Sequence, residues 1–207
     1  MSRTRAEVTG GERREPALEA AIVASPENPG GYLVYADWLQ QHGEPRGELI
    51  VVQHALAAAP RDAALRARQA ALFEEHGELL LGPLALVVDA RVDWHCGFVR
   101  ALDLGIVMSA RTELFVPLLA SLFAHPSLQF LHRFAGVVGY DTVLAPLADL
   151  APPTLRWLEL SGDAERIGEL KARLGRLPAR LLGIEHLQIE TRTYRGVAEW
   201  LADAGSA

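Results

Sequence analysis

Seven histidines and one cysteine, Cys96, are the side chains of this chain that could ligate a metal or act as a nucleophile. His95 and Cys96 are adjacent, and neighbouring strand residues point to opposite faces, so the two are poorly placed to share an ion. The spacings C-x-x-C, H-x-x-x-H and H-E-x-x-H are absent, as are G-x-x-x-x-G-K-[ST], G-x-G-x-x-G and G-x-S-x-G. We therefore expect no catalytic residue, no metal and no cofactor.

A second candidate is the pair Asp37 and Arg46, which flanks a predicted helix–turn. Together with Trp38 and Glu48 they could form a recognition patch. The structural interpretation is favoured, because a partly buried ion pair between them, or a cap on the next helix, would fix the angle between two helices. The aromatic residues Tyr32, Tyr35 and Trp38 are likewise expected in the core.

Four segments share one spacing of aliphatic residues, and their central leucines lie 29, 27 and 29 residues apart. A period in this range is typical of stacked repeats, in which each unit buries its apolar edge against the next. The segments are Val99-x-x-Leu102-x-Leu104, Leu128-x-x-Leu131, Leu155-x-x-Leu158-x-Leu160 and Ile184-x-x-Leu187-x-Ile189.

If these segments are strands, the residues that alternate with the aliphatic ones form an exposed sheet face. An aromatic centre with a polar rim is how protein-binding hot spots are built. The alternative is that Phe130 and Trp157 are covered by the N-terminal helices. The predicted protein-binding residues are Asp103, Phe130, His132, Trp157, Glu159, His186, Gln188 and Glu190.

Helical periodicity and turn residues predict the elements that position this face. Residues 1–15 are expected to be a disordered tail, 16–82 a helical module, and 83–207 a hairpin cap followed by about four repeat units. The first expected helix begins at Pro16 and ends before Ser25. The others are expected at Tyr32–Gln41, 48–59, 62–75, 112–124, 141–150, 163–174 and 194–204. Strands are expected at 84–94 and in a hairpin at 92–104.

The composition points to a globular protein. Half of the 207 residues are apolar, the net charge is −6 and Lys171 is the only lysine, so nucleic acid and anionic membranes are disfavoured as partners. No apolar run reaches about 18 residues, the length that a membrane-spanning helix needs. A cytoplasmic location is the expectation.

Parts of the sequence resemble known families. Tyr35-Ala-Asp-Trp-Leu39, Gly43-Glu-Pro-Arg-Gly47-Glu and the later Trp94-x-x-Gly97-Phe98 are similar to the bacterial repeat-companion domain. Residues 98–207 resemble leucine-rich repeats of the longer, helix-containing kind, although the usual asparagine after the strand is missing. The resemblance implies a bacterial leucine-rich-repeat protein and supplies no catalytic residues.

We expect an α/β protein with an N-terminal helical module, a β-hairpin cap and a short solenoid of parallel strands with helices on the outer side. The leading function is a non-enzymatic protein–protein interaction module for a partner with basic or aromatic groups. The alternative is a homo-oligomeric assembly component that uses the solenoid ends or the N-terminal helices. An enzyme with a pocket around His54, His76 or Asp89 is the weakest hypothesis.

Overall fold

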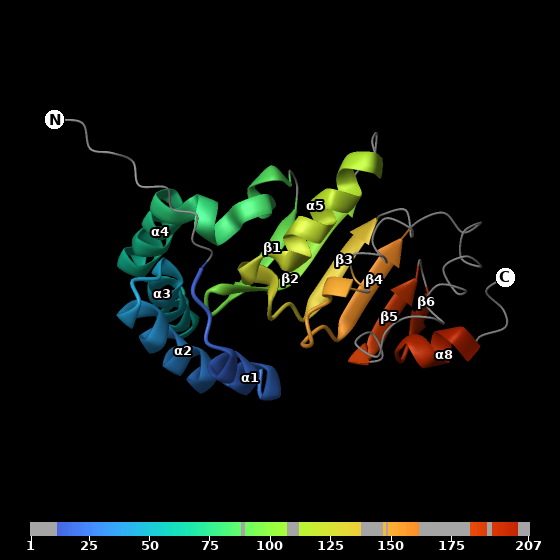
Figure 1. The fold of residues 1–207 in the computed structure, drawn as a ribbon, viewed down its shortest axis with the longest axis horizontal. Coiled ribbons are helices and arrows are strands. Elements are labelled where there is room, and N and C mark those ends of the chain that lie inside the picture. The colour runs from blue at the N-terminus through green and yellow to red at the C-terminus, as the bar shows by residue number, and fades with distance from the viewer. Residues whose placement is uncertain are drawn as a thin grey trace.

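The computed structural model describes residues 12–87, 90–106, 112–137, 147, 149–161, 183–189 and 192–202. Helices gather at the N-terminal end, and a sheet extends from them toward the C-terminal end (Figure 1). The chain therefore has the expected α/β class, with the helical part first and the sheet second.

The helical part contains α1 (Pro16–Ala24), α2 (Pro29–Gln41), α3 (Pro45–Ala58) and α4 (Ala63–Leu81). The bounds predicted for the first helix are confirmed. The second begins three residues earlier than expected, because the Asn28 side chain accepts a hydrogen bond from the Gly30 N–H at 3.0 Å and caps it. The fourth continues past Gly77 to Leu81, across a kink at His76.

Six strands form one sheet in chain order: β1 (Arg91–His95), β2 (Phe98–Ile106), β3 (Arg133–Val137), β4 (Trp157–Ser161), β5 (His186–Ile189) and β6 (Arg192–Tyr194). The sheet is mixed. Strands β2 to β5 are parallel, whereas β1 and β6 pair antiparallel with their neighbours. The predicted hairpin is present as β1 and β2, but the strand expected from residue 84 begins only at Arg91, after a 3-10 turn, η1 (Gly82–Leu86).

The core of the sheet is a ladder of apolar side chains in register. Leu102 pairs with Phe134, Phe134 with Leu158, and Leu158 with Leu187, and each is at most 1% exposed. Helix α5 (Thr112–Ala124) adds Leu119, Leu122 and Phe123 to the same cluster, and α8 (Val197–Ala202) adds the buried Trp200. The bounds predicted for α5 are confirmed, while the expected helix at 163–174 lies outside the described residues.

The predicted register of the second repeat is wrong by three residues. Phe134, not Leu131, pairs with Leu102 and Leu158, so successive ladder positions 102, 134, 158 and 187 lie 32, 24 and 29 residues apart. Leu128 belongs to a second 3-10 turn, η2 (Pro126–Leu128), and Leu131 is buried just before β3. Both leucines contribute to the core, but they lie in the segment before β3 and not in the strand itself.

Candidate functional site

The sheet face opposite the apolar ladder carries most of the predicted binding residues. Trp157 on β4 pairs with Arg133 on β3 and with His186 on β5. The row two residues further along the strands contains Asp103, Ala135, Glu159 and Gln188. The structure thus brings together Asp103, Trp157, Glu159, His186 and Gln188, whereas Glu190 lies outside the described residues.

Three of these side chains and Arg133 contact one another and form the sheet-face cluster: Arg133, Trp157, Glu159 and His186. The His186 ring stacks on Trp157 with 4.5 Å between centroids, and the Arg133 guanidinium lies 5.4 Å from the indole centroid. Arg133 Nη2 also donates to Glu159 Oε2 at 2.9 Å. Three neighbouring strands therefore present one continuous stack of planar groups that a carboxylate holds in place.

The sheet-face cluster is open to solvent but contains one buried donor. Arg133 and Glu159 have 48% and 28% of their side-chain surface exposed, and His186 is exposed. The indole Nε1 of Trp157 is buried and has no hydrogen-bond partner within the described residues. An acceptor that reached this atom would satisfy a donor that the described part of the chain leaves unpaired.

The prediction that Phe130 lies on this face is wrong. Phe130 precedes β3, is 5% exposed, and packs edge-on against Phe98 at 4.7 Å and Tyr32 at 5.8 Å between ring centroids. It belongs to the cluster that joins α1 and α2 to the hairpin, which is the covered position that the sequence left open as an alternative. The three-residue shift in register is the cause. Arg133 takes the place next to Trp157 that was predicted for Phe130.

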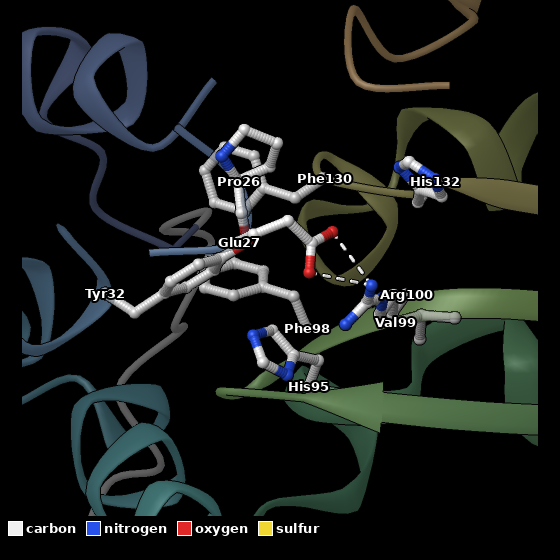
Figure 2. Close-up of a pocket in the computed structure, with 9 residues that line it drawn as sticks. All are labelled: Pro26, Glu27, Tyr32, His95, Phe98, Val99, Arg100, Phe130 and His132. Atoms are coloured by element: carbon white, nitrogen blue, oxygen red, sulfur yellow. Dashed lines mark hydrogen bonds and ion pairs between the residues drawn. The ribbon is translucent and has the colours of Figure 1, made fainter. Parts of the chain in front are cut away.

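The prediction for His132 is also wrong, since this residue lies just before β3 and faces the junction with the helices. It lines a small pocket with Glu27, His95, Arg100 and Tyr32 (Figure 2). Arg100 Nη2 contacts both carboxylate oxygens of Glu27 at 2.8 Å. The volume of about 10 Å³ has room for about one water molecule, so the pocket is too small for an organic ligand.

Two imidazole nitrogens at this junction, His95 Nε2 and His132 Nδ1, are buried without a hydrogen-bond partner within the described residues. Burial lowers the pKa of both histidines, and the positive charge of Arg100 lowers the pKa of each further. Both rings are therefore neutral at pH 7, and the junction favours the uncharged form.

The hairpin turn is held by α3 through the backbone of Gly97. Arg46 Nη1 donates to the Gly97 carbonyl at 2.6 Å, and the Gly97 N–H donates to Gln53 Oε1 at 2.8 Å. The Arg46 guanidinium also lies 4.9 Å from the Phe98 ring centroid. The predicted Asp37–Arg46 pair is wrong: Asp37 is exposed on α2, and the carboxylate bound to Arg46 comes from Glu12.

A larger groove lies between α3, α4 and the hairpin, and its lining includes Glu27, His54, His95 and Cys96. Its volume of about 510 Å³ would accommodate a small molecule. Burial raises the pKa of the Cys96 thiol to about 11, so this sulfur is protonated at neutral pH and is not an activated nucleophile. Of the other titratable groups predicted for an enzyme pocket, His76 sits at the α4 kink, and Asp89 lies outside the described residues.

The described residues contain neither a cluster suited to a metal ion nor a membrane-spanning helix. No three His, Cys, Asp or Glu side chains in this part of the chain lie where they could hold one metal ion. No helix there is long and apolar enough to cross a membrane.

Comparisons with models of protein families, with curated proteins and with solved structures find no match to this chain.

Proposed function

We propose that this chain is a non-enzymatic, cytoplasmic protein–protein interaction module of the leucine-rich-repeat type. The sheet-face cluster would be the centre of its binding surface. The observation that carries the proposal is the stack of Arg133, Trp157 and His186 across three parallel strands, with Glu159 beside it.

The backbone arrangement supports a repeat architecture. Strands β2 to β5 are adjacent, parallel and in chain order, and the same face of each contributes to one apolar core. In such stacks the opposite strand face is a broad surface of side chains at regular spacing, which is suited to binding an extended or folded protein segment. The helical part would act as the N-terminal cap.

The chemistry of the sheet-face cluster supports a protein ligand. Tryptophan and arginine are the residues most often found at energetically dominant interface positions. Here both have a neighbouring partner, since Arg133 donates to Glu159 and Trp157 stacks on His186. Glu159, Asp103 and Gln188 on the next row favour a partner with basic or aromatic side chains, and a carbonyl of that partner could accept from the indole Nε1.

The test is a comparison of purified variants for binding to a partner recovered from the native cell. Trp157→Ala is expected to weaken binding at least 10-fold, and Trp157→Ala with Glu159→Arg to abolish it, because truncating a hot-spot aromatic residue costs about 2 kcal/mol or more. Val34→Ala on the outer side of α2, where Val34 is 56% exposed, is the matched control and should bind as the wild type does. Unchanged affinity of the Trp157 variants would refute the proposal.

The alternative is a homo-oligomer that uses the sheet ends or the N-terminal helices. Light scattering over a range of protein concentrations separates the two. A mass that stays at one chain supports the interaction module, and a mass that rises and is reduced by substitutions at the helices or ends supports self-assembly.

A further inference from the structure

Arg46 is a buried cation whose guanidinium is already held on one side by the folded protein. The side chain is 1% exposed, its Nη1 donates to Gly97 O at 2.6 Å, and its Cζ lies over the Phe98 ring, 4.9 Å from the centroid. This leaves the edge formed by Nε and Nη2 to bind a carboxylate, and Glu12 fills it with both oxygens. Such a two-point contact is the preferred geometry between arginine and a carboxylate.

The carboxylate on Arg46 comes from outside the regular structure. Residues 12–15, the N-terminal segment, have no helix or strand and run past α3 to the start of α1 (Figure 1). In the described part of the chain, this segment is joined to α3 and its cap by the Glu12–Arg46 pair and by one exposed hydrogen bond, from Arg13 N to Glu44 at 3.3 Å. Arg14 bonds to Glu19 of α1, so it does not add to the attachment on α3.

The site and its occupant therefore differ in how firmly they are held. The Arg46 side chain is held by two contacts with the hairpin, whereas Glu12, whose side chain is 4% exposed, is attached to α3 through its own ion pair and the neighbouring Arg13 hydrogen bond. When Glu12 leaves, the guanidinium faces a space that matches one carboxylate, and an unpaired buried charge strongly favours a replacement of the same kind.

We propose that Arg46 is the centre of a carboxylate-binding site that Glu12 occupies within the same chain. An acidic side chain from an extended segment of a partner protein can occupy the site in its place. The N-terminal segment acts as an internal competitor, because its short connection to α1 gives Glu12 an effective concentration of about millimolar. The site lies on the helical part and does not depend on the sheet-face cluster.

The test opens the site in the full-length chain with Glu12→Ala and supplies the carboxylate from outside. The probe is a blocked, fluorescein-labelled peptide with the sequence of residues 8–16, and the control peptide has Gln at the position of Glu12. Fluorescence anisotropy is expected to show binding to the Glu12→Ala chain. Binding should be at least about 10-fold weaker to the wild-type chain, where Glu12 competes, and at least about 10-fold weaker for the control peptide.

Thermal melting provides the second readout. The peptide at 100 times its Kd should raise the Tm of Glu12→Ala by about 5–11 °C. Sodium acetate should also raise this Tm relative to sodium chloride at equal ionic strength. The double variant Glu12→Ala, Arg46→Met should show neither effect. If Glu12→Ala is unfolded in buffer, recovery of its helical circular dichroism on adding the peptide replaces the binding readout. Absence of binding, stabilisation and recovery, or equal effects of the two peptides, would overturn the proposal.

Discussion

Substitution of Gly97 by alanine tests how the helical part is attached to the sheet. Gly97 has φ 78°, and an added Cβ would lie 2.5 Å from Ile50 Cγ1 and 3.4 Å from Ile50 N. The turn cannot move away without losing the hydrogen bonds from Arg46 and to Gln53. A left-handed alanine costs about 1–2 kcal/mol and the overpacking about 1–3 kcal/mol, so the loss in unfolding free energy is about 2–5 kcal/mol.

Gly43 provides a matched control. It has φ 75°, nearly the same backbone conformation, but an added Cβ would meet no atom within 4 Å. Gly43→Ala should therefore cost only the conformational part, about 1–2 kcal/mol. Urea unfolding followed by circular dichroism gives both values, and each 1 kcal/mol also corresponds to about 2–4 °C in Tm for a chain of this size.

The difference in unfolding free energy between the two variants measures the steric cost of the contact between Ile50 of α3 and the hairpin turn. Ile50→Ala removes the clashing Cγ1, so it should make Gly97→Ala less costly in a double-mutant cycle, with a coupling of at least about 0.5 kcal/mol. Equal losses for Gly97→Ala and Gly43→Ala, together with additive behaviour with Ile50→Ala, would refute the described contact between helix and turn.

Three further predictions concern the ladder and two titrating groups. Phe134→Ala should cost about 3–5 kcal/mol in urea unfolding because Phe134 is fully buried, and Arg133→Ala at most about 0.5 kcal/mol; the reverse order would support the register predicted from the sequence. Burial and the charge of Arg46 lower the pKa of His125 to about 4. As the pH falls, this histidine is therefore protonated in the unfolded chain before it is protonated in the folded chain. Up to about 3 kcal/mol of stability is lost between about pH 6.5 and pH 4. NMR titration of the His125 ring checks the value, and a midpoint near 6.5 would contradict it. Cys96, with its thiol pKa raised to about 11, should react with a thiol reagent at pH 7.5 only after unfolding, and fast labelling of the folded chain would contradict the burial.

The parts of the fold that could be predicted from the sequence depend on local signals. The start of the first helix at Pro16, the end of the second at Gln41 and the hairpin at 92–104 are determined by neighbouring residues, and the structure confirms each of them. The second repeat could not be placed in the same way, because Leu128, Leu131 and Phe134 succeed one another at the same spacing of three. Only pairing with β2 and β4 selects Phe134, and pairing is not a property of the segment alone.

The candidate site could likewise be predicted only in part. Trp157, Glu159 and His186 lie on strands whose register was predicted correctly, and they share one face as expected. Arg133 was missed because a shift of three residues exchanges the two faces of a strand. The Glu12–Arg46 contact joins residues 34 positions apart, and the polar composition around Glu12 is typical of a disordered tail, so no local pattern indicated it.

The two antiparallel outer strands, β1 and β6, restrict where further strands can be inserted into the sheet. A strand–helix unit added between two of the inner strands β2 to β5 would meet parallel neighbours on both sides, while the hairpin and β6 would keep their own contacts. Longer or shorter versions of the chain could therefore arise by duplication or deletion of an inner strand–helix unit. The two outer strands would stay the same and would still end the sheet. The width of the exposed sheet face would then vary while the hairpin and β6 stayed unchanged.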